Sequence, residues 1–435
     1  MSLQKYIFFL TYQNYKQFYY FCCKIKAVLK QILHTFITKI SGSVLGFATI
    51  IMISQILGAT QKGEQAMIVF NVYVLMLIFN LVGNSTLIYL TPRYRFSNLL
   101  IASFTWIFVL SLLSLIVILC FPNVIFQYGY ETLLIVILAS ISEINQFFLL
   151  GKEKIKQANK IKIISPLITV LLLTVLWLCN ALNTTYDFVL SLCFSYFVSM
   201  LYGVFLLKEE YKSTMKASIN GKELLQTLRL MLGKGATKQL GTIMQALNYR
   251  LLFHILLIYC GKSVVGVYSN AVSLAEAVML FGTSLALVQY SKLSNSDDKM
   301  MSARLTIRMT KVNALFTMIA LLILCFIPSS VYCWLFGSDF ANVGYIIRLL
   351  SIGILLLSCT SNITQFFASQ GNFSISAIAS AAGFVVTLSV GLWLVPIYGI
   401  QGAALTSVCS FSVASLVEGI CFLRWKKKDG DTFSK

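Results

Sequence analysis

Three positive side chains stand inside long apolar runs of the sequence. Arg250 lies within QALNYRLLFHILLIYCG, residues 245–261, and Lys39 and Arg348 interrupt two other runs. Even on mild scales an arginine at the centre of a bilayer costs about 2.5–3.5 kcal/mol, so such a residue must face protein or water. A planar guanidinium with five N–H donors suits phosphate oxygens. These three cations are therefore candidate ligands for an anion held within the membrane.

Each cation also has an ordinary structural interpretation. Arg250 can pair permanently with Glu143 or Glu276, which lie about midway along their own apolar runs, and so join helices. Lys39 lies about one helical turn into its run, and Arg348 some 10 Å from the end of another, by about 1.5 Å per residue. Both side chains are long enough to extend towards the membrane surface. The sequence alone does not decide whether these cations bind a ligand or only join helices.

The same carboxylates are candidates for coupling transport to an ion gradient. A carboxylate within the membrane can alternate between a protonated or cation-bound form and a free form, so we take Glu276 first and Glu143 second. His254 shares a helix face with Arg250 one turn earlier, and can carry a proton or act as a hydrogen-bonded structural residue. Glu418 lies one turn from the end of its run, and we expect it to reach water.

Side-chain amides occur in the same runs, at Gln245, Asn248, Asn80 and Asn145. They can donate hydrogen bonds to sugar hydroxyls, or they can join neighbouring helices. The 11 cysteines form no CxxC pair and no ligand spacing, so no metal site is predicted. No Walker-type glycine loop is present, so no nucleotide and no other cofactor is expected.

The elements that hold these residues must be membrane helices. Of 435 residues, 58% are hydrophobic and 11% are charged, and the mean hydropathy is +0.82. Spanning a core about 30 Å thick takes roughly 20 apolar residues, and the runs lack the alternation of barrel strands. Twelve spans are predicted, at 34–58, 66–90, 99–121, 132–150, 161–180, 187–207, 231–259, 264–290, 312–328, 341–368, 373–395 and 399–423.

The positions of Lys and Arg predict the orientation of these spans. With the N-terminus in the cytoplasm, 29 of the 34 cations fall in cytoplasmic segments, including the cluster from Lys152 to Lys162, and only Lys62 and Lys262 fall in outside loops. Both termini are then cytoplasmic. A net charge of +19 spread in this way is explained by topology and by attraction to anionic membrane lipids, so nucleic acid is not an expected partner.

The two halves of the chain resemble each other. Gln146-Phe147-Phe148, followed by Gly151 and later Trp177, is matched by Gln365-Phe366-Phe367, Gly371 and Trp393. Because each half holds six spans, an even number, the repeats have parallel topology. The predicted fold is therefore an all-α integral membrane bundle of two six-helix lobes. Its parts are an interfacial segment 1–33, an N-lobe 34–207, a linker 208–230, a C-lobe 231–423 and a basic tail 424–435.

The linker can lie on the membrane with Leu224, Leu225 and Leu228 facing lipid as one stripe, or it can be a solvated connection. Around the last turn, Pro396 is predicted to end one span and Gly399 to supply a tight turn, while Gly402-Ala403-Ala404 permits close helix packing.

With these elements in place, a family resemblance emerges. PIYGIQGAA, residues 396–404, resembles the opening of the last helix in the multidrug/oligosaccharidyl-lipid/polysaccharide exporter superfamily, and ITKISGSVLGFATIIMISQILGATQKG and GKSVVGVYSNAVSLAEAVMLFGTSLALV are similar to other segments of it. The chain looks most like the flippases that move O-antigen and capsule repeat units in polysaccharide biosynthesis. A basic residue matching Lys39 lies in the cavity of the related lipid II flippases.

The resemblance implies a transporter in the bacterial inner membrane, not an enzyme. Its central cavity would open alternately to either side, and its cargo would be an undecaprenyl-diphosphate-linked oligosaccharide, with the membrane lipids and a polysaccharide polymerase as partners. Arg250, Lys39 and Arg348 would bind the diphosphate of this cargo.

Two other functions compete with the flippase. A drug or metabolite:cation antiporter of the same superfamily would share the fold but is expected to have a more acidic, aromatic cavity with fewer cations. A membrane enzyme, such as a polysaccharide polymerase or a lipid-linked glycosyltransferase, needs an aqueous loop with acid/base residues or metal ligands. The predicted loops are too short for such a site, and no Asp-rich motif is present. A scaffold without transport is disfavoured by the repeat and the buried charges.

Overall fold

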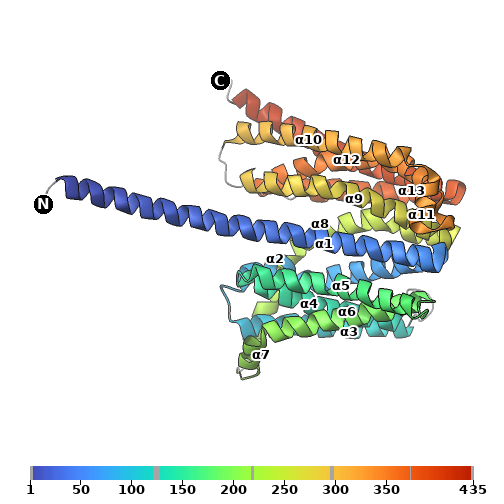
Figure 1. The fold of residues 1–435 in the computed structure, drawn as a ribbon, viewed down its shortest axis with the longest axis horizontal. Coiled ribbons are helices and arrows are strands. Elements are labelled where there is room, and N and C mark those ends of the chain that lie inside the picture. The colour runs from blue at the N-terminus through green and yellow to red at the C-terminus, as the bar shows by residue number, and fades with distance from the viewer. Residues whose placement is uncertain (1–2, 121–127, 217–219, 294–297, 373, 433–435) are drawn as a thin grey trace.

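The chain folds into an elongated bundle of helices (Figure 1). The computed structural model describes residues 3–120, 128–216, 220–293, 298–372 and 374–432. The helices and two short 3₁₀ turns are α1 (Leu3–Phe79), η1 (Asn80–Val82), α2 (Asn84–Leu90), α3 (Phe96–Cys120), α4 (Gly129–Gly151), α5 (Ile155–Leu178), α6 (Thr185–Leu206), α7 (Lys208–Met215), α8 (Gly221–Cys260), α9 (Lys262–Leu293), α10 (Lys299–Phe326), α11 (Ser329–Phe336), η2 (Ser338–Phe340), α12 (Val343–Ser369) and α13 (Ser374–Thr432).

Ten helical segments in the described residues are long and apolar enough to cross a membrane. Two of them, residues 37–90 and 374–427, are 54 residues long, which at about 1.5 Å per residue far exceeds a bilayer core of about 30 Å. Each contains a glycine with a positive φ that interrupts its long helix, Gly58 (φ 77°) in α1 and Gly399 (φ 56°) in α13. Glycine adopts this left-handed backbone without a steric cost. The predicted turn at Gly399 is confirmed.

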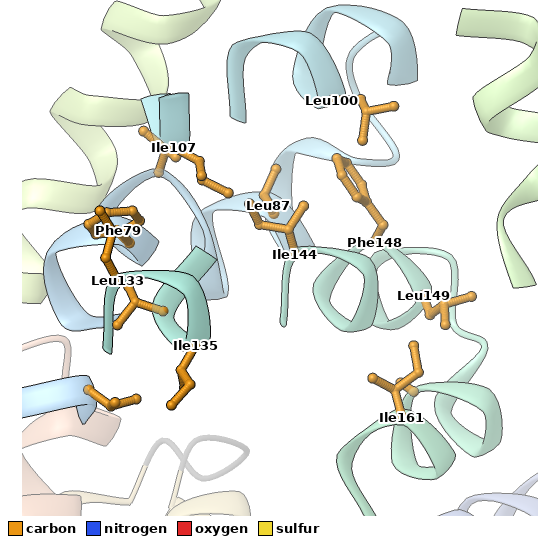
Figure 2. Packing of buried hydrophobic residues seen from close by; sticks show 14 of the residues in the cluster. Phe79, Leu87, Leu100, Ile107, Leu133, Ile135, Ile144, Phe148, Leu149 and Ile161 are labelled. Atoms are coloured by element: carbon orange, nitrogen blue, oxygen red, sulfur yellow. The ribbon is translucent and has the colours of Figure 1, made fainter. Parts of the chain in front are cut away.

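The bundle has two main hydrophobic cores, one in each half of the chain. The core of the N-half, residues 37–206, is drawn in part in Figure 2, where Phe79, Leu87 and Ile107 gather against Leu133 and Ile144. The core of the C-half, residues 242–427, is built mainly from α8, α9, α12 and α13 and includes Tyr268 and Phe340. Helix α1 enters both cores, because Ile53 and Val72 belong to the first and Ala59 and Met67 to the second.

The predicted linker is helical and packed. Residues 208–215 form α7, and α8 begins at Gly221 and continues without a break to Cys260, through the predicted lobe boundary at residue 231. Leu224 and Leu228 pack against the core of the N-half, while Leu225 is exposed. Both interpretations of the linker were therefore wrong for Leu224 and Leu228, because apolar side chains beside an open protein core bury themselves there.

The predicted interfacial segment 1–33 is helical from Leu3 and continuous with α1, but its side chains lie outside the described residues. The basic tail is helical through Thr432, as the end of α13.

We call the two ends of the bundle the Gly58 end and the Lys39 end. The breaks at Gly58 and Gly399 and the short helix α11 lie at the former (right in Figure 1), and both chain termini project from the latter. At the Gly58 end the two halves touch backbone to backbone. A Cβ atom on Gly63 would overlap the Lys262 carbonyl oxygen, and one on Gly266 would overlap that of Ala59. Glycine at both positions therefore permits this close approach.

Candidate substrate cavity

A cavity of about 510 Å³ lies between the two halves, midway along the bundle. The N-half contributes α1, α5 and α6, and the C-half contributes α9. Its polar lining residues are Ser43, Thr49, Gln65, Ser165, Thr169, Tyr196, Ser273 and Glu276. A second cavity of about 270 Å³ lies within the C-half between α9, α12 and α13, and Glu276 lines it as well. Glu276 therefore lines both cavities.

Arg250 is bound to that carboxylate. Its Nη2 donates a hydrogen bond to Oε1 of Glu276 at 2.6 Å, which joins α8 to α9, and its guanidinium lies 5.4 Å from the centre of the Phe253 ring. The side chain of Arg250 is 27% exposed and that of Glu276 is 45% exposed, so the pair is not sealed in the core. Glu276 lines both cavities, whereas Arg250 is a lining residue of neither. An arginine that loses an exposed partner can accept another anion at little cost. The observed pair is one of the two that the sequence allowed.

Glu143 is held differently from Glu276. Oε2 of Glu143 accepts a hydrogen bond of 2.6 Å from Nδ2 of Asn80, which links α4 to η1. Arg250, Glu276 and Glu143 all lie within electrostatic range of Tyr73 in α1. The three candidate charges are therefore in the same region of the bundle. His254 packs edge-on against Phe70, with ring centroids 4.8 Å apart, and its buried Nδ1 has no hydrogen-bond partner in the described residues. Its proposed part in proton coupling stays a prediction.

Two of the four candidate amides join helices. Oδ1 of the buried Asn248 accepts hydrogen bonds of 2.6 Å from Thr387 and from Ser410, which ties α8 to α13. Asn145 is fully buried, and its Oδ1 accepts a hydrogen bond of 2.7 Å from the hydroxyl of Tyr211. Neither side chain lines the two cavities described above. Asn80 is occupied by Glu143, whereas Gln245 is exposed on α8.

The structure separates Arg348 from the other cations. It is exposed on α12 near the Gly58 end, within electrostatic range of Cys325 and Tyr332, and lines neither cavity described above. Lys39 is exposed on α1, one turn before the cavity-lining Ser43. Sequence reasoning missed Lys162, which it counted with the cytoplasmic cluster although the predicted span 161–180 includes it. Helix α5 begins at Ile155, so Lys162 lies two turns inside it, three residues before the cavity-lining Ser165.

Two further predictions were wrong. Lys62 does not lie in a loop, because the helix resumes directly after Gly58. Its side chain is 2% exposed, and its Nζ donates a hydrogen bond of 2.7 Å to Oε1 of Gln65. Glu418 does not reach water. It is 6% exposed and accepts a hydrogen bond of 2.7 Å from Thr364, because α12 packs against α13 at this position.

Comparison with solved structures identifies the fold. The lipid II flippase MurJ in an inward closed conformation superposes with a TM-score of 0.72 at 16% identity, over 89% of this chain and 86% of that one. The chain has the fold of the MOP transporters. An inward-facing MATE family multidrug resistance transporter of the MOP superfamily gives 0.69 at 13% identity, over 89% of this chain and 96% of that one. An outward-facing one gives 0.61 at 13% identity, over 93% and 97%.

No family model matches the sequence. Among curated proteins, no relative matches it either.

Proposed function

We propose that this protein is a flippase that moves a diphosphate-linked oligosaccharide on an undecaprenyl carrier across the bacterial inner membrane by alternating access, in surface polysaccharide biosynthesis. The observation that carries the proposal is the ion pair that Arg250 forms with Glu276, a residue that lines the cavity between the halves. A lipid diphosphate that enters the cavity would displace Glu276 from the guanidinium of Arg250. The diphosphate oxygens match the planar donors of arginine, and a diphosphate carries more charge than one carboxylate.

The likeness to MurJ, a lipid II flippase, supports a lipid-linked cargo. The match to the inward-facing MATE structure is better than that to the outward-facing one, which supports assigning the Lys39 end to the cytoplasm.

In this proposal both termini are cytoplasmic. The breaks at Gly58 and Gly399 divide each of the two long segments into two crossings, so that the ten segments give twelve crossings. The Gln-Phe-Phe repeats fall at corresponding places, near the C-terminal ends of α4 and α12, as a parallel duplication requires.

Release of Glu276 from Arg250 also suggests how an ion gradient is coupled to transport. The freed carboxylate faces both cavities and can take up a proton or a cation until the anion leaves. This feature equally suits a drug:cation antiporter with the same fold, which would use Glu276 for the cation and Arg250 only to hold it. The two functions differ in what Arg250 contacts.

A complementation assay of surface polysaccharide export tests the proposal. We expect Arg250→Ala to abolish export and to leave lipid-linked units on the inner leaflet at near-normal protein abundance, and Arg250→Lys to restore part of it. Arg308, exposed on α10, supplies the matched control in Arg308→Ala, for which we expect full export. If Arg250 only holds Glu276, then Arg250→Ala lowers abundance and the double variant with Glu276→Gln recovers export. That recovery, or full export by Arg250→Ala, refutes the proposal.

A further inference from the structure

The segment that follows Gly58 is broken a second time, inside the predicted span 66–90. Helix α1 ends at Phe79, the turn η1 occupies Asn80–Val82, and α2 begins only at Asn84. The break lies within the apolar segment 37–90, which is long enough to cross a membrane. Backbone that leaves the helix at membrane depth is tolerated only where protein or a polar cavity surrounds it. In many secondary transporters, carbonyl oxygens at such a break coordinate a cation.

Two oxygens of Asn80 border this break. Asn80 is 5% exposed, and its Oδ1 has no hydrogen-bond partner in the described residues. Its backbone oxygen accepts one hydrogen bond, of 3.0 Å from the amide of Gly83, and keeps a second lone pair. A Cβ atom on Gly83 would lie 3.4 Å from that backbone oxygen and 3.6 Å from Oδ1. Both oxygens therefore face one space, which exists because Gly83 has no side chain.

A carboxylate lies on the other side of the same amide. Oε2 of Glu143 in α4 accepts a hydrogen bond of 2.6 Å from Nδ2 of Asn80. Lys162 is within electrostatic range of Glu143, but the ion pairs within 4.0 Å in the part of the chain that the structure describes do not include Glu143. A neutral amide does not compensate the charge of a carboxylate in a membrane span. The break therefore has unsatisfied oxygens and excess negative charge.

The C-half has a neutral group at the matching position. Glu143 stands three residues before the first Gln-Phe-Phe sequence, and Asn362 stands three residues before the second. Asn362 is fully buried, and its Nδ2 donates a hydrogen bond of 2.6 Å to Gln289 while its Oδ1 accepts one of 2.9 Å from Asn313. Neutral partners satisfy this amide at both ends. The N-half instead combines a carboxylate with an orphaned oxygen, which is costly in a low-dielectric interior.

We propose that the break between α1 and α2 binds a monovalent alkali cation, Na⁺, through the side-chain and backbone oxygens of Asn80. Hard cations prefer oxygen ligands, and water supplies the remaining ones. Glu143 acts as a positioning residue, because its hydrogen bond fixes the amide with Oδ1 facing the break and its single charge balances that of the ion. A space that one methyl group would fill suits Na⁺ better than the larger K⁺.

This site lies apart from the Arg250–Glu276 pair, to which the proposed function assigns ion coupling, and it does not depend on the cargo. The competing interpretation is that a proton neutralises Glu143 and that Asn80 only joins η1 to α4. The two interpretations differ in whether Na⁺ stabilises the chain. A cation that binds only the folded state raises the melting temperature, whereas a protonated carboxyl group gives no dependence on Na⁺ at constant pH and ionic strength.

The test uses the purified full-length chain in detergent, with radioactive Na⁺ for binding and thermal unfolding as a second readout. We expect saturable binding of Na⁺ and a melting temperature about 2–5 °C higher in NaCl than in choline chloride of equal ionic strength. KCl should give a smaller increase. Absence of saturable Na⁺ binding by the wild-type chain overturns the site, and an equal effect of K⁺ overturns the assignment to Na⁺.

Variants locate the ion. Asn80→Ala and Glu143→Gln should each raise the Kd for Na⁺ at least about tenfold, because one removes a ligand and the other the balancing charge. Glu143→Asp, which keeps the charge, should retain part of the affinity. Glu418→Gln is the matched control, since Glu418 is 6% exposed and also bound to a neutral group, the Thr364 hydroxyl. Its Kd should stay within about twofold of wild type.

An unchanged Kd for Glu143→Gln, or an equal loss for Glu418→Gln, overturns the site. Because these measurements involve no transport, they fail independently of the flippase. A normal export phenotype for Arg250→Ala would remove the proposed function and leave Na⁺ binding at Asn80 in place.

Discussion

The two ends of the bundle join the halves in different ways. At the Gly58 end the contact is made by backbone, with Gly63 and Gly266 each lying against a carbonyl group of the other half. Polar contacts reinforce it, because Lys262 pairs with Glu64 at 2.6 Å and the amide of Ala59 donates to Asp339 at 3.1 Å. Towards the Lys39 end the halves enclose the cavity, and exposed lysines stand beyond its lining residues.

Under the proposed function, this difference would let the protein close one side and admit a large headgroup from the other. Backbone contact leaves no room for water or substrate, whereas side chains around a cavity leave a volume that a ligand can fill. The closed end also buries one cation at a cost, since Lys62 is 2% exposed and bonded only to the neutral Gln65 in the described residues. Closure at the Gly58 end is therefore a balance between tight packing and a buried charge.

Gly63→Ala should have the largest effect on this balance. The added Cβ meets backbone, which cannot rotate away, so the halves must separate at the Gly58 end. We expect the equilibrium to shift away from closure by about ten- to a hundredfold, which corresponds to about 1.4–2.8 kcal/mol of overpacking. The readout is the distance between spin labels at Thr60 and Ser263, both exposed, in a chain whose cysteines are replaced.

Gly42→Ala supplies the matched control on the same helix, because a Cβ at Gly42 meets nothing within 4 Å. The control should leave the distance distribution unchanged. If Gly63→Ala also leaves it unchanged while the chain stays folded, the backbone contact does not hold the halves together.

Lys62→Met should act in the opposite direction and less strongly. Methionine has a similar length and no charge, so the closed end no longer buries an ammonium group, and closure should gain about 1–3 kcal/mol. The gain is best read in the Gly63→Ala background, where closure is incomplete and the label distance can shorten. A longer distance in the double variant would contradict the balance described above, since Lys62 would then favour closure.

The sequence predicted most of the helices and few of the contacts between them. The apolar run 99–121 became Phe96–Cys120, and the turn at Gly399 follows from a glycine after a proline. Lys162 was overlooked because it was counted with the charged cluster that begins at Lys152, although the helix that carries it begins at Ile155 and includes the last lysines of that cluster. The twelve crossings and the parallel repeat stay predictions.

Which partner a buried charge takes is a property of the packed structure. The sequence allowed Arg250 to pair with Glu143 or with Glu276, and only the crossing of α8 and α9 selects Glu276. The burial of Lys62 likewise depends on how closely Gly63 and Gly266 allow the halves to approach, and no residue near Lys62 in the sequence reports that distance.

The smallest expected effect concerns an ion pair between the N-half and the linker, at the Lys39 end. Lys152, after α4, pairs with Glu210 of α7. Burial works to raise the pKa of Glu210, but the hydrogen bond from Lys152 and the charges of Lys152 and Lys154 outweigh it, so the pKa lies below its ordinary value. A carboxyl with a lowered pKa stabilises the fold above its unfolded-state pKa, and this contribution is lost as the pH falls through its folded-state pKa.

Glu210→Gln should therefore lower the melting temperature at pH 7 by only about 1–2 °C, because partly exposed ion pairs are weak. The difference from wild type should vanish in acid, once Glu210 is protonated in both states. Because both residues belong to the N-half and its linker, the label distance between Thr60 and Ser263 should not change, in contrast to Gly63→Ala. A change in that distance would mean that the Lys39 end controls closure at the Gly58 end, and the two ends would then be coupled through the N-half itself.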